Sequence, residues 1–306
     1  MKKLIAYGVV SIIFCASLMV FAIQVEAVTL PNGSVIKAEG AFDIFLVQNG
    51  QKHRFLNPTV LKSWFYKNDD ASTKGVDWSA VNLKELSTNE FVALPTGEDV
   101  AVTPGSFLIQ FGVGTAIYSV GINKELYKLD NPATAVKFFG KNWGKRVIIF
   151  PKHYTDRYGE VKGSLNENWS VNSKPADLSI TYFYPSDWKI HKKGEVLMGS
   201  VSNIEGSAIF EVYEYKDVPR SIKEIALGNF IKVDSEIETR IDGYAAYRVQ
   251  GLGTSGGRNI AIEETVIKVN SKIYIIMFID YNESEDVKNS ENYVTYLKML
   301  SGVRFK

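Results

Sequence analysis

The stretch that comes closest to a catalytic motif is the glycine-rich run GLGTSGG at residues 251–257. It matches the G-x-S-x-G nucleophile elbow through Gly253 and Ser255, and its start matches the G-x-G-x-x-G phosphate-binding turn. The elbow needs a histidine after the serine, but every histidine of the chain precedes Ser255. The phosphate turn needs the start of a helix, whereas the alternating residues 260–269 predict a strand. We therefore expect a glycine-rich hairpin loop, which could form a binding edge.

Acidic residues suggest metal binding or acid–base chemistry at two places. Residues 68–70 (NDD) with Asp77 offer oxygen ligands, but they lack the alternating spacing and the glycine of a calcium loop. Glu263 and Glu264 are neighbours on a predicted strand, so they should face opposite sides of a sheet, and charged strand positions are usually solvated. The sequence predicts no metal, no cofactor and no catalytic residue. Carboxylate pairs formed by the fold stay open.

Aromatic side chains gather where short helices are expected, and rings of this kind can stack against sugars. Ring residues four apart on short amphipathic helices more often fill a core, and we expect that role for most of them. The candidate ligand surface consists of three of these rings and two residues of the glycine-rich run: Trp64, Tyr66, Trp143, Gly253 and Ser255.

Trp64 and Tyr66 belong to a block that occurs twice, at residues 30–66 and 102–140, and Trp143 follows the second copy. Asn57-Pro58 in the first copy answers Asn131-Pro132 in the second, and each pair suits the cap and first turn of a helix. Each copy predicts three short strands and a helix. Because so small a unit usually needs its neighbour to close a core, we expect the copies to share one interior.

The rest of the chain has a different sequence pattern and shows no copy of this block. Residues 161–177 are rich in Gly, Ser, Asn and Pro, which predicts a linker between a repeat domain at 28–160 and a second domain at 178–306. In the second domain, alternating stretches predict strands, with hairpin turns at Asp242-Gly243 and Asn270-Ser271. The fold class is therefore α+β, a tandem β-rich repeat followed by an antiparallel α/β sandwich.

The N-terminus predicts export. A short basic start, an apolar run at residues 4–23 and small residues at Val25 and Ala27 are typical of a signal peptide spanning residues 1–27. An uncleaved anchor is the alternative, because the run is long enough to span a bilayer. Cys15, the single cysteine, lies inside this segment, so the mature chain would have no disulfide. We expect an extracytoplasmic protein that meets a membrane only if this segment is retained.

The composition argues against nucleic-acid binding. The 306 residues are 45% hydrophobic and 23% charged, which is a globular composition with room for about two domains. Lys plus Arg is 35 and Asp plus Glu is 34, so no net field attracts a polyanion.

Two resemblances follow from these patterns. The duplicated block, with Gly33-Ser34, Arg54-Phe55 and the two Asn-Pro pairs, resembles a tandem repeat of exported bacterial proteins that has no assigned activity. The second half, with Pro185-Ser186-Asp187-Trp188 and the segment 241–248 (IDGYAAYR), is similar to the PsbP-like fold. The first resemblance implies an envelope or surface role, and the second implies an accessory or binding protein.

The expected function is therefore that of an exported, non-catalytic binding or presentation protein whose partner is an envelope glycan or a surface protein. The alternatives are a carboxylate-dependent polysaccharide or peptidoglycan hydrolase and a self-assembling surface-layer component. A pocket holding two carboxylates roughly 5–10 Å apart would favour the hydrolase.

Overall fold

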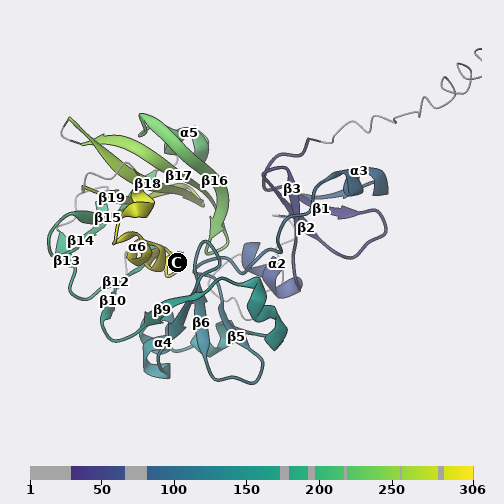
Figure 1. The fold of residues 1–306 in the computed structure, drawn as a ribbon, viewed down its shortest axis with the longest axis horizontal. Helices are drawn as coiled ribbons and strands as arrows, with labels where there is room; N and C mark the ends of the chain where they lie inside the picture. Colours follow the sequence, from purple (N-terminus) through teal and green to yellow (C-terminus); the bar gives the residue numbers. More distant parts are fainter. Residues whose placement is uncertain are drawn as a thin grey trace, which may run out of the picture.

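A computed structural model describes residues 29–65, 81–172, 179–191, 197–216, 219–255, 257–281 and 286–305 (Figure 1). The predicted signal peptide, Tyr66 and the acidic cluster at residues 68–77 lie outside the described residues. The fold is mixed α+β, rich in strands, with few helices and several sheets.

The first small sheet has the strand order β3-β2-β1-β4, in which β1 and β4 run parallel. Its hairpin turn uses Asn49 and Gly50 at φ angles of 51° and 71°, as the Asn-Gly pair predicts. The Asn57 side chain accepts hydrogen bonds from the first turn of α2, and Ser87 with Glu90 forms a capping box on α3. The elements are β1 (Val35–Ala38), β2 (Phe45–Gln48), β3 (Gln51–Arg54), α2 (Pro58–Trp64), β4 (Leu83–Leu86) and α3 (Thr88–Ala93).

The second small sheet has the order β8-β5-β6-β7-β9, with β5 and β8 parallel. Asn131 caps α4 with nearly the same extended backbone as Asn57 has at α2. The elements are β5 (Leu108–Phe111), β6 (Ile117–Val120), β7 (Leu126–Leu129), α4 (Pro132–Phe139), η1 (Trp143–Arg146), β8 (Val147–Phe150), η2 (Lys152–Arg157) and β9 (Val161–Leu165).

One hydrophobic cluster joins the two small sheets. It contains Phe55, Val60 and Trp64 from the first sheet and its helix, and Ile109 and Phe150 from the second sheet. Because side chains of both sheets are buried against one another, this cluster holds the two sheets together. Each sheet is too small to close a core alone.

A seven-stranded antiparallel sheet dominates the C-terminal half, with the order β13-β14-β15-β19-β18-β17-β16. Figure 1 shows α6 within the curve of this sheet and α5 on the opposite side. The elements are β13 (Lys189–His191), β14 (Leu197–Ser202), β15 (Ala208–Lys216), α5 (Ile222–Leu227), β16 (Lys232–Ile241), β17 (Tyr244–Ser255), β18 (Arg258–Val269), β19 (Lys272–Asp280), η3 (Val287–Asn289) and α6 (Tyr293–Leu300).

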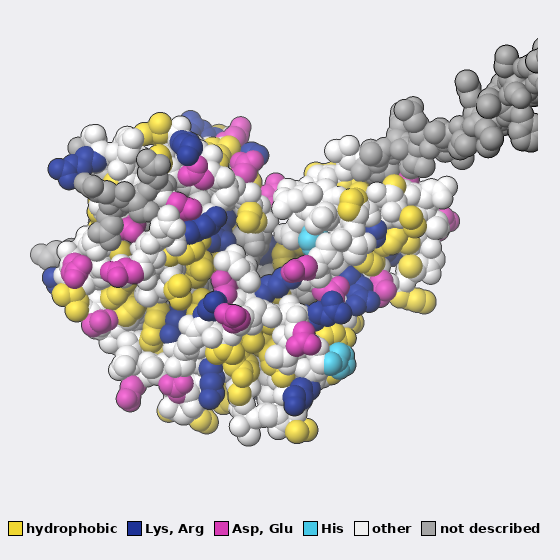
Figure 2. Space-filling model, viewed as in Figure 1, with side chains coloured by type: hydrophobic (Ala, Val, Ile, Leu, Met, Phe, Trp, Pro, Cys, Tyr) yellow, Lys and Arg dark blue, Asp and Glu magenta, His cyan; other side chains and the backbone are white. Residues whose placement is uncertain are grey.

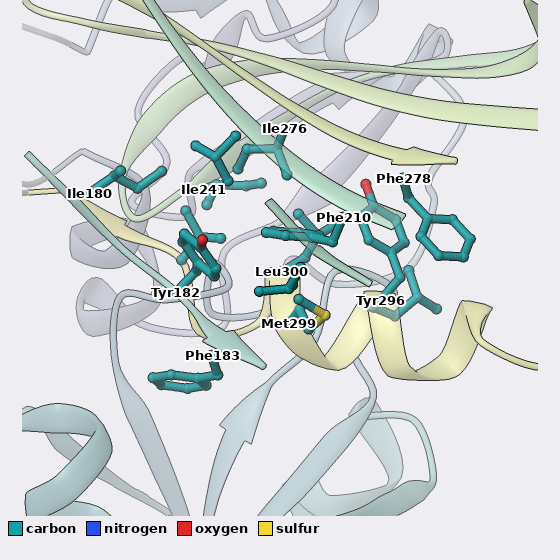
Figure 3. Close-up of a cluster of buried hydrophobic side chains, with 14 of the residues drawn as sticks. Ile180, Tyr182, Phe183, Phe210, Ile241, Ile276, Phe278, Tyr296, Met299 and Leu300 are labelled. Atoms are coloured by element: carbon teal, nitrogen blue, oxygen red, sulfur yellow. The ribbon is translucent and has the colours of Figure 1, made fainter. Parts of the chain in front are cut away.

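The main core lies between this sheet and α6. Figure 3 shows Phe210, Phe278 and Tyr296 packed together there, and the rings of Phe278 and Tyr296 stack with centroids 4.8 Å apart. Short strand pairs close the ends of this core: β10 (Trp169–Val171) with β12 (Phe183–Pro185), and β11 (Ile180–Thr181) with β20 (Arg304–Phe305).

The segment expected to be a linker, residues 161–177, is strand-forming over most of its described part. β9 pairs in parallel with β7, and β10 pairs with β12. Trp169 is buried in the main core, and the ammonium of Lys298 lies 4.2 Å from the centre of its ring. The polar composition of this segment predicts a linker, because its strands form only by pairing with β7 and β12, which lie outside the segment. The same core includes Leu108, Tyr127 and Phe138 of the second small sheet and its helix, so this sheet packs directly on the C-terminal half.

Among the described residues, no helix is both long enough and apolar enough to cross a membrane.

Candidate functional site

The outer face of the seven-stranded sheet is covered by one short helix. Ser221 caps α5 through a capping box with Glu224. The helix presents Ala226, Ile222 and Ile225 to the hydrophobic residues of this face. Because α5 has only six residues, it covers β17 and β18 and leaves room beside it.

A groove of about 570 Å3 lies between α5 and the sheet. We call it the α5 groove. Its walls are mainly apolar, from Ile225, Ile273 and Ile275, with the half-exposed ring of Tyr215 at one side. The charged residues Arg220 and Glu224 also line it. A concave, largely apolar site with a few polar groups is the usual form of a small-molecule site.

Glu264 lies beneath the turn that follows α5. It is 0% exposed, and its Oε2 accepts a hydrogen bond of 2.8 Å from Nδ2 of Asn229, a residue that lines the α5 groove. Its Oε1 has no hydrogen-bond partner among the described residues. Burial raises the pKa of Glu264 to about 7, against the opposing effect of the Asn229 hydrogen bond. A perturbed buried acid next to a groove is a frequent mark of a functional site.

The glycine-rich run positions this arrangement. Gly251 and Gly253 lie in β17 and not in a hairpin loop, which corrects the sequence-based expectation. A Cβ on Gly251 would lie 2.0 Å from the carbonyl oxygen of Lys232, and one on Gly253 would lie 3.1 Å from that of Asn229. The missing side chains therefore let the turn after α5 approach the sheet closely enough for Asn229 to reach Glu264.

Strand register places Glu264 in a row of three carboxylates across the outer face. Glu264 and Glu211 both pair with Met277, and Glu264 and Glu236 both pair with Val249. Neighbours in this row are two strand spacings apart, roughly 10 Å between Cα atoms. Glu211 accepts a 2.6 Å hydrogen bond from the Tyr213 hydroxyl, and Glu236 forms an ion pair with Lys223 at 3.1 Å.

Glu263 faces the opposite side of the sheet, as expected from its position next to Glu264. It accepts hydrogen bonds from Arg248, Tyr293 and Gln250. Both glutamates are 0% exposed, so the expectation that these charged strand positions are solvated is wrong. The reason is that α5 covers one face and α6 the other. The Arg248–Glu263 pair is hydrogen-bonded on all sides, which is how a buried charge pair is tolerated.

The ring residues predicted for a ligand surface lie apart. Trp64 is 9% exposed, donates from Nε1 to the Ala101 carbonyl at 2.8 Å, and borders a cavity of about 370 Å3 between the small sheets and β16. Trp143 is half-buried and borders a different cavity of about 300 Å3 beside Asn131 and Pro132. Phe138 is fully buried, as core packing requires.

The two glycine-run candidates lie elsewhere again. Gly253 lies beneath Asn229 at the turn after α5, and Ser255 ends β17 with its side chain outside the described atoms. Of the five candidate residues, Trp64, Trp143 and Gly253 therefore lie at three different places, while Tyr66 and the side chain of Ser255 are outside the described part of the chain. Sequence reasoning expected Glu264 to be solvated and missed Asn229. The available signal was a pair of glutamates among the mainly apolar residues of β18.

Glu98 and Asp99 line another crevice, of about 300 Å3, but each is paired with a cation. Glu98 contacts Lys124 at 2.7 Å, and Asp99 contacts Arg157 at 3.0 Å and Arg54 at 3.5 Å. The hydrogen bond and charge of Lys124 hold the pKa of Glu98 below its usual value. A carboxylate stabilised in its ionised form, as Glu98 is, is unsuited to donate a proton. On the face shown in Figure 2, acidic and basic side chains are interspersed without a large patch of one sign.

Comparison with protein-family models finds no match, and comparison with curated proteins finds none. Among solved structures, the chain is similar to a protein from Bacteroides thetaiotaomicron at 13% identity and TM-score 0.32, covering 42% of this chain and 45% of that one. It is similar to cyanobacterial PsbP from Synechocystis at 8% identity and TM-score 0.36, covering 46% and 94%. A Pseudomonas aeruginosa protein of unknown function matches at 10% identity and TM-score 0.21, covering 38% and 84%. The chain thus spans less than half of the Bacteroides protein, and none of these matches carries a functional argument.

Proposed function

We propose that this is an exported, non-catalytic binding protein of the cell envelope, whose ligand occupies the α5 groove. The observation that carries the proposal is a mainly apolar groove of about 570 Å3 next to a fully buried acid with a free oxygen. Export is supported by the basic and apolar pattern of residues 1–27. In this proposal the small sheets present the C-terminal domain at the envelope, where a glycan or surface protein is the expected partner.

We also propose that the two small sheets are tandem copies of one unit and that the second half of the chain has a PsbP-like fold. The orders β3-β2-β1-β4 and β7-β6-β5-β8 correspond strand by strand, and each unit has a helix opened by an Asn-Pro pair. These correspondences support two tandem copies of one unit. The assignment of the second half to a PsbP-like fold rests on its sequence resemblance.

Extraction of bound molecules tests the binding function. The full chain is incubated with a solvent extract of bacterial envelopes, purified again, and its bound small molecules are identified by mass spectrometry. Ile225→Arg places a charged side chain in the groove and should reduce the recovered ligand at least about ten-fold. Lys223→Gln, on the same helix but outside the groove lining, is the matched control and should retain it. Failure of the wild-type chain to enrich any molecule would contradict the proposal.

Retention on the envelope is a separate part of the proposal. The chain without residues 1–27 should sediment with purified peptidoglycan or intact envelopes, and Ile225→Arg, which alters the α5 groove and leaves the small sheets intact, should sediment to the same extent. Loss of sedimentation in Ile225→Arg would assign envelope retention to the groove and remove the presentation role of the small sheets.

One observation favours a second candidate, a carboxylate-dependent glycan hydrolase. Glu211 and Glu264 share one row of the sheet, and a pKa of about 7 suits Glu264 to act as a general acid. Against this, Glu264 is fully buried under Asn229, so a glycosidic oxygen could reach it only if the turn after α5 moved. Release of soluble fragments from peptidoglycan that Glu264→Gln abolishes would establish the hydrolase. Equal release by wild type and variant would exclude Glu264 from that role.

A further inference from the structure

The chemical class of the ligand can be argued from the charges around the α5 groove, and this inference rests on the proposed function. Glu264 is the deepest polar group beside the groove, since it is 0% exposed while the neighbouring lining residue Asn229 is exposed. Asn229 satisfies one carboxyl oxygen, and the second has no partner among the described residues. A buried acceptor left in this state costs free energy that a suitable donor would recover.

The groups facing Glu264 favour a cation over an anion. The row that contains it holds the carboxylates Glu211 and Glu236 as well, and the one ion pair described in that row is Lys223 with Glu236. Among the described residues, no ion pair involves Glu264. The row itself does not line the groove, whose charged lining residues are Arg220 and Glu224. A ligand head that passes Asn229 and reaches Glu264 would meet the row, which attracts an ammonium group and repels a carboxylate or phosphate.

All but one of the elements packed around Glu264 contribute titratable or charged groups to this balance. They are Tyr213 and Tyr215 with Glu211 on β15, Glu236 on β16, Tyr247 on β17, Lys268 on β18, Lys223 and Glu224 on α5, and Arg220 just before α5. β19 presents Ile275 and Met277 next to Glu264 and adds no charge. Burial raises the pKa of Tyr215, with a contribution from the charge of Glu264, so this ring stays a neutral donor.

The rest of the groove suits an alkyl or other apolar body. Ile273 is 1% exposed and Ile275 is 7% exposed, and Ile225 closes the opposite wall. We propose that the α5 groove binds a cationic amphiphile, a molecule with an apolar body and an amine head, and that the amine pairs with the free oxygen of Glu264. The turn at Asn229 acts as the gate, since its side chain lies between Glu264 and the groove.

Three probes with the same apolar body and different heads test this inference on the full chain: octylamine, octanol and octanoate. At about pH 8 the amine is cationic and Glu264 is mostly ionised. Calorimetric titration should show octylamine binding about ten-fold or more tightly than octanol, with octanoate weakest, because a charge-assisted hydrogen bond contributes at least that factor. At about pH 5.5 the preference for octylamine should shrink, because Glu264 is then protonated.

Variants assign the effect to one carboxylate. Glu264→Gln should bind octylamine and octanol within about two-fold of each other. The control Glu39→Gln, at an exposed glutamate beside the first small sheet, should keep the wild-type preference. Thermal unfolding of both variants checks that each is folded. Persistence of the octylamine preference in Glu264→Gln would overturn the role of Glu264.

The outcomes separate the two proposals. If the wild-type chain binds octylamine and octanol equally well, the ligand is not a cationic amphiphile. If Ile225→Arg then loses the binding of both probes, the groove is still the binding site. Absence of binding by all three probes, together with an empty envelope extraction, would contradict the binding function itself.

Discussion

Replacing Glu264 with glutamine should change the pH dependence of stability in a way that the structure defines. Burial moves the pKa of this carboxyl from its ordinary value of 4.5 to about 7 in the folded chain. A shift of this size corresponds to about 3 kcal/mol of unfolding free energy.

The sign follows from proton binding. Below about pH 4.5 the carboxyl is protonated in both folded and unfolded chains, and it contributes no pH dependence. Between pH 4.5 and 7 the folded chain holds a proton that the unfolded chain has released, so the free energy of unfolding falls as the pH rises. Above about pH 7 the loss is complete. Glu264→Gln lacks this titration, so its stability relative to wild type should rise across that window by up to about 3 kcal/mol.

Urea unfolding of both chains at several pH values between about 4.5 and 8 measures this difference. Comparing the variant with the wild type at each pH cancels the contributions of all other titrating groups. A constant cost of burying the amide offsets the difference equally at every pH and does not affect its pH dependence. Glu236→Gln is the matched control, because its carboxylate lies in the same row but is exposed. A stability difference that stays constant within about 0.5 kcal/mol from pH 4.5 to 8 would refute the buried, proton-binding Glu264.

Four further predictions concern the fold, and urea unfolding at neutral pH measures each of them. Arg248→Met should lower the free energy of unfolding by about 3–5 kcal/mol, because it leaves Glu263 buried without its cation. The double variant Arg248→Met with Glu263→Gln should recover part of that loss. If the effects of the two substitutions simply add, the pairing is contradicted. Gly251→Ala should cost about 1–3 kcal/mol through the clash with Lys232, whereas Gly144→Ala, which meets nothing within 4 Å, should be neutral. Asn131→Ala should cost about 1 kcal/mol by removing the α4 cap, and equal stability would show that the cap is dispensable. Trp64→Ala should cost about 3–5 kcal/mol, far more than Trp143→Ala, because Trp64 fills the core between the small sheets.

The local features of the fold were predictable because a few neighbouring residues decide them. Asn49-Gly50 and Asp242-Gly243 adopt the positive φ angles that their hairpin turns require. The caps of α2, α4 and α5 follow from Asn57, Asn131 and Ser221. Each of these signals acts over four residues or fewer, so no knowledge of the tertiary structure is needed to recognise it.

The candidate site was not predictable, since distant segments form it. Glu264 is buried only because the turn after α5 packs on β17, and that approach depends on Gly251 and Gly253. From sequence alone those glycines suggest a loop, and a glutamate in a strand suggests a solvated face. In the same way, residues 161–171 form strands because β7 and β12 supply their hydrogen bonds.

The most direct test of the central claim is a crystal structure of the full chain with octylamine at about pH 8. We predict the alkyl chain against Ile225, Ile273 and Ile275, with its nitrogen within hydrogen-bond distance of Glu264. Octylamine bound instead in the cavity beside Trp64, or a fully occupied site with its nitrogen directed away from Glu264, would contradict the account.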